Sequence, residues 1–524
     1  MLMLRVRPAK LFFRGFMHPI QFFLRSARRC PEAVAVEADE GTLTYRALCR
    51  KIEALACALQ AIDSQPLSRV GICARNRIDH LVAWLAVLAA EKTWIPLFPG
   101  NAAAEINRCI AFTEASIVLA DADGLALIDA PGATVIPIAD AQSGSREGMR
   151  ALIERFAGDF PSRGFPSLDG AQAIKFTGGT TGQPKGVCQP FRAWNTNIAT
   201  QLHCYGLRSG DRYFAAAPIT HGTSTYILPT LAVGGTVVLA DRPKPVEVLQ
   251  ALAERDITTV FVPPTVIYMM MAEPGVEALN FPRLRHLIYG AGPMRPDEIG
   301  RAQAIFGPVV ASTYGQTEAP QIATFISAYD LKRPEKRAAV GRATMLTQVE
   351  TMDREGRLLP PGEEGEVVIR GDLVMTGYWN QPEKTAETLV GGWLHTGDIG
   401  VFDEEGFLFL KGRLKDLVIT GGFNVYPADV EPVLGRHPAV QDCAIYGVPD
   451  VKWGEALHAA VELRPGKDVG AAELIAFVKA ELGSFKAPKA VRFYEALPRN
   501  AYGKLQKHEL IAAEQQTPTR KPTR

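Results

Sequence analysis

Residues 236–263, TVVLADRPKPVEVLQALAERDITTVFVP, indicate the fold class of the chain. Its two ends are short apolar runs with the length and β-branched content of buried strands. The middle, residues 245–256, has the spacing of an amphipathic helix. The apolar side chains on its one face are Val246, Leu249, Leu252 and Ala253. Strand, helix and strand in this order are typical of a βαβ unit, so the stretch predicts an α/β fold with parallel strands.

The same alternation extends on both sides of this unit. The candidate strands are the apolar runs at 173–176, 212–218, 236–241, 258–263, 286–290 and 309–313. Several of them lead into glycine-rich or polar segments, namely residues 177–186, ITHGTS (219–224), AGPM (291–294) and YGQTE (314–318). Ligands of open α/β sheets bind beyond the carboxyl ends of the strands, so we expect these segments to converge on one cleft.

The character of the sequence changes twice further along the chain. Past residue 340 it becomes hairpin-like, with Glu404-Glu405-Gly406 as a turn between two alternating runs. From about residue 417 short strands and helices of α+β type follow. A chain of 524 residues is too long for one hydrophobic core, so we expect at least two domains, with the polar junction 412–416 as the hinge.

The composition excludes several classes of function. Lys plus Arg total 57 and Asp plus Glu total 56, so no net charge attracts nucleic acid. The eight cysteines are scattered without zinc-site spacing, which favours buried thiols in a reducing, cytoplasmic compartment; a reactive thiol is the minority interpretation. The longest apolar run, 80–90, is too short for the roughly 20 residues of a membrane span and predicts a core helix.

The first thirty residues contain basic and aromatic side chains and no acidic one. This composition is compatible with a membrane-surface or transit segment. Ordinary domain sequence begins near Met17, however, and a disordered extension is the simpler interpretation.

Residues 176–186, FTGGTTGQPKG, have the composition of a phosphate-binding loop. The glycines allow backbone N–H groups to turn towards an anion. The side chains that add donors or positive charge are Thr177, Thr180, Thr181 and Lys185. The lysine does not directly follow the last of the clustered glycines, so the loop is not a P-loop. A flexible surface loop is the alternative, but so many Gly and Thr residues directly after a strand indicate binding.

Five motifs, in this order along the chain, resemble those of the adenylate-forming superfamily, which contains acyl-CoA synthetases, peptide-synthetase adenylation domains and luciferases. They are FTGGTTGQPKG, STYGQTEAP (312–320), LHTGDIG (394–400), GRLKDLVITGGFNVYPADVE (412–431) and PRNAYGKLQ (498–506). Together with GEVVIRGDLVMTGYWNQPEKTAE (365–387), the match runs from about residue 30 to 510.

The resemblance implies an α/β fold with a large N-terminal domain of βαβ-layered subdomains, a small β-barrel-like subdomain and a small, mobile α+β C-terminal domain. The boundaries we expect are a disordered basic extension at 1–16, the N-terminal AMP-binding domain at 17–412, the hinge at 413–416, the C-terminal AMP-binding domain at 417–513 and a disordered tail at 514–524.

The resemblance also implies a two-step reaction. ATP converts a carboxylic acid to an acyl-adenylate with loss of pyrophosphate, and a thiol then displaces AMP. The residues implied to bind ATP and AMP are Thr177, Gly178, Gly179, Thr180, Thr181, Gly182, Lys185, Gly290, Ala291, Gly292, Tyr314, Gly315, Asp398 and Arg413. The catalytic residues implied are Lys504, Glu318, Thr317 and His221, and Glu318 is also the implied ligand of Mg²⁺. Without the resemblance, Asp398 reads as a turn residue and Lys504 as a solvated lysine.

The other implied residues concern the acid and the thiol. Those expected to line the acyl pocket are His221, Tyr226, Val262, Pro263, Gly290 and Gln316. This wall is mostly apolar, with no Arg or Lys placed to meet a second carboxylate, which favours a fatty or aromatic monocarboxylic acid. Those expected to bind coenzyme A are Gly421, Gly422, Phe423 and Trp453, and Lys415 is the expected hinge residue. A structural histidine and a core tryptophan are the alternatives for His221 and Trp453.

The sequence therefore predicts an ATP-dependent carboxylate–CoA ligase that releases AMP and pyrophosphate. A free-standing adenylation enzyme that loads a carrier-protein thiol would share every ATP motif, and a luciferase-like oxygenase shares them too. The intact set Glu318, Asp398, Arg413 and Lys504 argues against a non-catalytic nucleotide-binding protein. The expected partners are a small carboxylic acid and coenzyme A, with no nucleic acid and no integral membrane segment; homodimerisation is left open.

Overall fold

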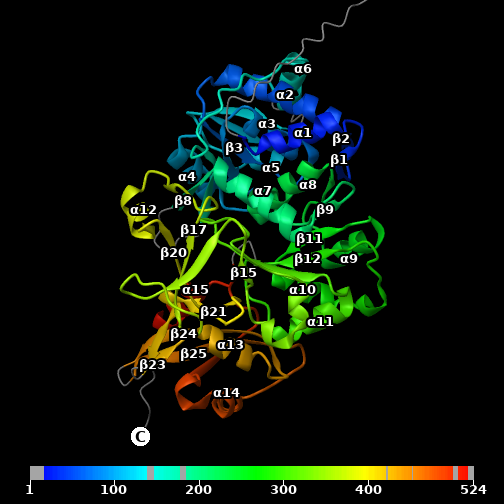
Figure 1. The fold of residues 1–524 in the computed structure, drawn as a ribbon. Coiled ribbons are helices and arrows are strands. Elements are labelled where there is room, and N and C mark those ends of the chain that lie inside the picture. Colours follow the sequence, from blue (N-terminus) through cyan, green and yellow to red (C-terminus); the bar gives the residue numbers. More distant parts are fainter. Residues whose placement is uncertain are drawn as a thin grey trace, which may run out of the picture.

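The computed structural model describes residues 17–138, 147–177, 185–420, 423–450, 453–499 and 505–516. Within these residues the strands form four sheets, three of them before residue 417 and one after it (Figure 1). The predicted disordered extension 1–16 lies outside the described residues, as does the middle of the glycine-rich loop, 178–184.

The first sheet has nine strands and contains the predicted βαβ unit. In spatial order its strands are β15 (Arg342–Ala343), β14 (Thr324–Ile326), β13 (Val310–Tyr314), β12 (His286–Tyr289), β11 (Thr259–Val262), β9 (Arg212–Ala215), β10 (Thr236–Leu239), β1 (Val34–Ala38) and β2 (Gly41–Thr44). Helix α9 (Pro245–Glu254) connects β10 to β11, and both strands run parallel to β9 between them. The α/β prediction is therefore confirmed.

Side chains of this sheet alternate between two separate cores. On β11, Phe261 enters the core that contains helices α7 (Phe191–Tyr205) and α8 (Ser224–Val233). Its neighbours Val260 and Val262 enter the opposite core, with α9, α10 (Pro264–Ala272) and α11 (Pro296–Phe306). This is the period of two that an extended strand imposes.

The second sheet has seven strands. Their spatial order is β18 (Gly377–Tyr378), β8 (Lys185–Pro190), β7 (Ala171–Thr177), β4 (Thr93–Leu97), β3 (Arg69–Cys73), β5 (Ile117–Ala120) and β6 (Thr134–Pro137). The predicted strand 173–176 is thus β7, in a different sheet from the other five candidates, and it pairs antiparallel with β8. Apolar rhythm along one chain does not encode which strands become neighbours, so the sequence could not separate the two sheets.

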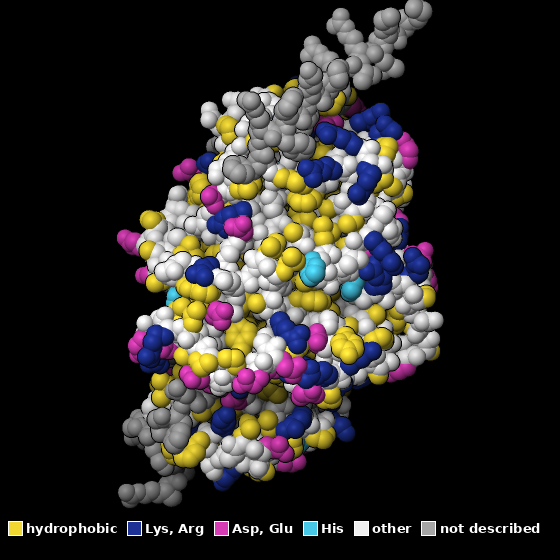
Figure 2. Space-filling model, in the orientation of Figure 1, with side chains coloured by type: hydrophobic (Ala, Val, Ile, Leu, Met, Phe, Trp, Pro, Cys, Tyr) yellow, Lys and Arg dark blue, Asp and Glu magenta, His cyan; other side chains and the backbone are white. Residues whose placement is uncertain are grey.

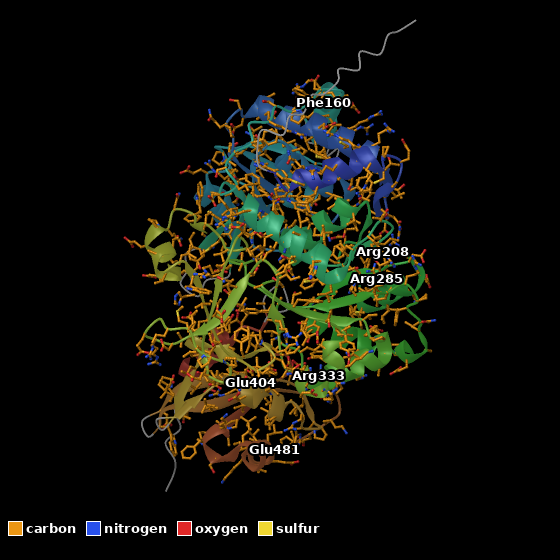
Figure 3. The ribbon with its side chains drawn as sticks, in the orientation of Figure 1. Phe160, Arg208, Arg285, Arg333, Glu404 and Glu481 are labelled. Carbon is orange, nitrogen blue, oxygen red and sulfur yellow. The ribbon has the colours of Figure 1, made fainter. Side chains whose placement is uncertain are left out.

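The third sheet is the predicted small β subdomain. It contains β16 (Gln348–Met352), β17 (Gly365–Arg370), β20 (Trp393–Phe402), β19 (Leu389–Val390) and β21 (Leu408–Arg413), paired antiparallel. The predicted turn joins β20 to β21, and Arg333 binds Glu405 of this turn with both terminal nitrogens, at 2.8 and 2.7 Å. Figure 3 shows Arg333 near Glu404 where the first and third sheets meet.

The fourth sheet forms the small α+β domain, at the bottom of Figure 1. Its strands are β23 (Phe423–Val425), β22 (Val418–Thr420), β25 (Gly454–Leu463), β24 (Val440–Asp450) and β26 (Ala490–Tyr494). Its helices are α13 (Pro427–Leu434), α14 (Ala471–Lys486) and α15 (Lys507–Gln516). It touches the large domain where Arg295 Nη1 donates to the carbonyl of Gly435 at 2.7 Å.

The end of this domain differs from the prediction. The boundary at 513 falls inside α15, and Glu514 is a buried anchor, not the start of a disordered tail. Its carboxylate accepts hydrogen bonds from Tyr446, His458 and Arg492, one on each of three strands. These polar contacts hold the helix against the sheet; residues 517–524 lie outside the described residues.

The remaining helices cover the first and second sheets. They are α1 (Ile20–Arg29), α2 (Tyr45–Ile62), α3 (Ile78–Ala89), α4 (Ala103–Thr113), α5 (Ala122–Leu125), α6 (Met149–Arg155) and α12 (Pro382–Thr388). Short 3₁₀ turns lie at η2 (Val276–Ala278), η3 (Asp330–Lys332), η4 (Pro334–Lys336) and η5 (Leu414–Asp416). The predicted core helix 80–90 is confirmed as the buried α3.

In the described part of the chain, no helix combines the length and apolarity needed to cross a bilayer. Figure 2 shows acidic and basic side chains interspersed over the visible face.

Candidate active site

The polar segment after β9 forms a single π-type turn, η1 (Ile219–Thr223), with His221 inside it. His221 departs from helical geometry, at φ −106° and ψ −147°. Its ring nitrogen Nδ1 lies 2.7 Å from Thr220 Oγ1, and its ring meets Phe98 edge-on at 5.1 Å. Burial, with a smaller contribution from nearby Lys175, lowers the pKa of His221 to about 4, so the imidazole is neutral at pH 7.

The predicted acyl wall is aromatic and only partly as expected. Tyr226 is 2% exposed and stacks on Phe261 at 4.9 Å. Val262, predicted for this wall, enters the opposite core, and its neighbour Phe261 is the β11 side chain on the same side as Tyr226. Pro263 begins the next helix as its N-cap. The polar partner of Tyr226 is Gln321, whose Nε2 donates to the tyrosine hydroxyl at 2.8 Å.

Two glycines next to this wall are closely packed against backbone atoms. A Cβ atom at Gly290 would lie 3.1 Å from the carbonyl oxygen of Thr313, and one at Gly315 would lie 2.8 Å from the backbone of Gln321. The intervening Ala291 has a positive φ of 64°, and Gly292 is exposed beside it. Gly290 therefore packs against β13 next to Tyr314, and Gly315 packs against the backbone of the segment that follows it.

A buried carboxylate joins the first and third sheets. Asp398, 6% exposed, accepts hydrogen bonds on Oδ2 from Tyr314 at 2.6 Å and from Gln316 at 2.7 Å. Arg413 lies opposite it on β21, with Nε 2.9 Å from Oδ1. Gln316, predicted for the acyl pocket, is thus placed beside Asp398. Since Oδ2 already has two donors, the open acceptor position of this carboxylate is on Oδ1.

A second carboxylate, Glu318, lies four residues after Tyr314 and contacts the second sheet. Its Oε1 accepts the hydroxyl of Tyr378 at 2.9 Å, and its carbonyl accepts the backbone N–H of Met375 at 2.8 Å. The ring of Tyr378 lies 5.6 Å from the Nζ of Lys185. Tyr378, which the sequence analysis did not single out, therefore joins the predicted metal ligand to the lysine of the glycine-rich loop.

The two ends of the glycine-rich loop are fixed by strand pairing. Thr177 and Lys185 are direct partners across β7 and β8. The predicted residues Gly178, Gly179, Thr180, Thr181 and Gly182 lie outside the described residues. Thr317, the remaining predicted catalytic residue of this region, is held by its carbonyl, which accepts Gln189 Nε2 at 2.8 Å. The residues predicted to bind phosphate, metal and ribose thus come from three sheets and lie around the end of β13.

A buried lysine beside the His221 turn was not among the predicted site residues. Lys175 of β7 is 8% exposed, and its Nζ donates to the carbonyl of His221 at 3.1 Å and to Ser224 Oγ at 2.9 Å. Sequence reasoning passed over it because it stands inside the short apolar run AIKF. A charged residue within a buried strand was the signal that could have revealed it.

Comparison with known proteins agrees with this geometry. A family model described as AMP-binding enzyme matches residues 23–379, and one described as AMP-binding enzyme C-terminal domain matches residues 429–504. The chain belongs to the AMP-binding enzyme family.

Related proteins of known name include two ligases. A medium/long-chain-fatty-acid–CoA ligase, FadD8 of Mycobacterium tuberculosis, is 37% identical over 347 residues, 65% of this chain and 60% of that protein. The feruloyl-CoA synthase of an Amycolatopsis species is 33% identical over 493 residues, 93% of this chain and 97% of that protein. A solved mutant of the amide bond synthetase McbA from Marinactinospora thermotolerans superposes with a TM-score of 0.87 at 30% identity, covering 95% of this chain and all of that one.

The remaining predicted residues of this AMP-binding enzyme lie in or next to the small domain. Lys415 is exposed in η5, the 3₁₀ turn that connects β21 to β22. Trp453 precedes β25, where Gly454 pairs with Thr420 next to the predicted coenzyme A segment. Lys489 Nζ lies 5.4 Å from the Trp453 ring. Gly421, Gly422 and Lys504 lie outside the described residues, as does the side chain of Phe423.

Proposed function

We propose that this chain is an ATP-dependent carboxylate–CoA ligase that forms acyl-CoA through an acyl-adenylate, with release of pyrophosphate and AMP. The observation that carries the proposal is the end of β13. Residues 314–318 supply Tyr314, which contacts Asp398, and Glu318, which contacts Tyr378 beside Lys185. Groups suited to a ribose, a metal ion and a phosphate chain therefore meet at one strand end, as binding of Mg·ATP requires.

The predicted site residues have separate roles in adenylation. Asp398 and Arg413 hold the ribose, and Lys185 with Thr177 holds the phosphates that leave as pyrophosphate. Lys504 is proposed to bridge the carboxylate and the α-phosphate. Such positioning of two reactants contributes up to about 7–11 kcal/mol to catalysis. In the second step the small domain turns about Lys415 and presents the segment near Trp453 to the thiol.

Glu318 fits a hard divalent cation. Tyr378 donates to one carboxylate oxygen and thereby orients the other for a ligand. The described residues contain no cluster of three or more His, Cys, Asp or Glu side chains that would bind a metal alone. Mg²⁺ commonly binds through one or two carboxylates together with substrate phosphates and water. When bound, Mg²⁺ would neutralise the charge of those phosphates.

The aromatic wall supports a fatty or aromatic monocarboxylic acid as substrate. Tyr226 and Phe261 form a buried stack, and Gln321 adds one amide to an otherwise apolar surface. Both ligase relatives are named for acids of these two kinds. Mostly apolar pockets with a few placed polar groups bind such ligands by burial and orient them by hydrogen bonds.

The experiment is a pyrophosphate-release screen over aliphatic and aromatic acids, with and without coenzyme A. We expect release that depends on the acid, and an acyl-CoA product identified by mass spectrometry. Acyl transfer to a carrier protein but not to coenzyme A would favour the adenylation-enzyme alternative. Because the superposed structure is named as an amide bond synthetase, an amine should be included as a third acceptor.

A further inference from the structure

Lys175 differs from the other deeply buried lysines of the described chain. Lys92 and Lys336 each form an ion pair, with Asp63 and Asp403. Among the described residues, no carboxylate lies within ion-pair distance of Lys175. Lys175 is two residues before Thr177 and lies on the same face of β7 as that residue.

The surroundings of Lys175 solvate its ammonium group without cancelling its charge. Nζ donates to the His221 carbonyl and to Ser224 Oγ, and Ser224 Oγ donates to the same carbonyl at 2.8 Å. The rings of Trp94 and Trp194 lie 5.1 and 5.4 Å from Nζ. Neutral acceptors and ring faces are favourable partners for a cation, but they leave a net positive charge in the interior.

Three hydrogen bonds among Lys175, Ser224 and the His221 carbonyl fix the backbone of the η1 turn. His221 is the residue of that turn with non-helical dihedral angles, and its carbonyl receives both side-chain donors. The backbone position of His221 therefore depends on Lys175. Single π-type turns of this kind are frequent at functional sites.

We propose that Lys175 is a positioning residue for the carboxylic acid substrate. It holds the His221 turn in place and gives the acyl end of the site a positive charge that attracts the carboxylate. This inference rests on the ligase function proposed above. The hydrogen bonds of Lys175 Nζ go to the His221 carbonyl and to Ser224 of α8, so its loss should weaken binding of the acid more than binding of Mg·ATP.

The charge of Lys175 also gives the proposal a pH signature. Burial lowers the pKa of Lys175 to about 7, so its charge is present below that pH and is lost above it. His221 is the titratable group that faces it, and it stays neutral through this range because its pKa is about 4. The groups packed against Lys175 from β4, α7 and α8 are Trp94, Trp194 and Ser224, none of which titrates there.

The test compares Lys175→Met and Lys175→Gln with the wild type in acid-dependent pyrophosphate exchange between pH 6 and 9. The acid is the best wild-type substrate of the screen, so the wild-type reaction first establishes the ligase function independently. We expect Lys175→Met to raise the KM for the acid about 10-fold to 100-fold at pH 6, the scale of a hydrogen bond to a charged group, with the KM for Mg·ATP within about twofold. Lys175→Gln restores a donor to the His221 carbonyl and should recover part of the loss, without the pH dependence.

The wild type should show a rise in the KM for the acid above pH 7 that neither variant shows. Lys92→Met is the matched control, because it removes a buried lysine of the same region, 1% exposed, whose partners lie away from the site. We expect it to lower stability and to leave both KM values unchanged. The proposal is overturned if Lys175→Met raises both KM values equally, or if it leaves the KM for the acid and its pH dependence as in the wild type.

Discussion

Asp398 offers the sharpest test of nucleotide binding, through the substitution Asp398→Asn. The change keeps the size of the side chain but replaces one acceptor oxygen by an amide donor. Tyr314 and Gln316 donate to Oδ2, and Arg413 Nε faces Oδ1. Whichever way the new amide turns, its NH₂ group faces at least one of these donors. One charge-assisted hydrogen bond is then lost in the free protein, at a cost of about 1.5–3 kcal/mol.

Asp398→Asn also removes the carboxylate charge that is proposed to bind the ribose of the nucleotide. Loss of the ribose contact should cost about 2–4 kcal/mol in the transition state, which corresponds to a fall of about 30-fold to 1000-fold in kcat/KM for Mg·ATP. The assay is acid-dependent pyrophosphate exchange at varied ATP, together with calorimetric titration of Mg·ATP. Thermal unfolding should show a stability loss of about 1–3 kcal/mol.

Asp403→Asn is the matched control for this prediction. Asp403 lies in the turn between the same two strands and accepts hydrogen bonds from Phe407, Glu405 and Lys336. Its substitution should lower stability and leave ATP affinity unchanged. If folded Asp398→Asn protein binds Mg·ATP within about threefold of the wild type, the assignment of Asp398 to the nucleotide is wrong.

The other predictions concern the metal, the second step and the small domain. Glu318→Gln should raise the Mg²⁺ concentration needed for half-maximal adenylation at least tenfold, because a contact to a charged ligand contributes about 1.5–3 kcal/mol to binding. If titration of Mg²⁺ at fixed ATP shows an unchanged requirement, Glu318 is not a metal ligand. Lys504→Ala should abolish adenylation but leave thioester formation from supplied acyl-adenylate largely intact; equal loss of both half-reactions would contradict domain alternation. Burial opposes ionisation of Glu514, but its bonds with His458 and Tyr446 and the charge of Arg492 hold its pKa below the ordinary value. Its stabilisation is therefore present at neutral pH and is lost as the pH falls through the lowered pKa. Glu514→Gln should be less stable than the wild type by about 1–3 kcal/mol at pH 7, and this difference should shrink as the pH falls below 4.5; a difference that stays constant on acidification would show that charge is not the cause.

The local elements of this fold were predictable because their signals are local. The run 236–263 gave strand, helix and strand because apolar spacing changes period within a few residues of each boundary. The turn between β20 and β21 was predictable from Glu404-Glu405-Gly406 for the same reason. The end of α15 was not, because Glu514 is held by partners on β24, β25 and β26 that only folding brings near.

The candidate site was predictable from motifs but not from contacts. Asp398 and Glu318 stand in the motifs, whereas the hydrogen bonds that Gln316 donates to Asp398 and Tyr378 donates to Glu318 were not predicted, because contacts between separate sheets leave no spacing signal. The side of β11 on which Phe261 and Val262 lie could have been predicted from the sequence. Neighbouring side chains of a strand point to opposite faces, so only one of the two can share a face with Tyr226.

The function proposed for this chain begins with activation of a carboxylic acid by adenylation. The most direct test is exchange of radiolabelled pyrophosphate into ATP, catalysed by the purified full-length protein with Mg²⁺ and each acid of the screen, in the absence of coenzyme A. We predict exchange with at least one fatty or aromatic acid, and its loss when the acid is omitted. ATP cleavage to ADP, or no exchange with any acid while the protein binds Mg·ATP, would contradict the claim.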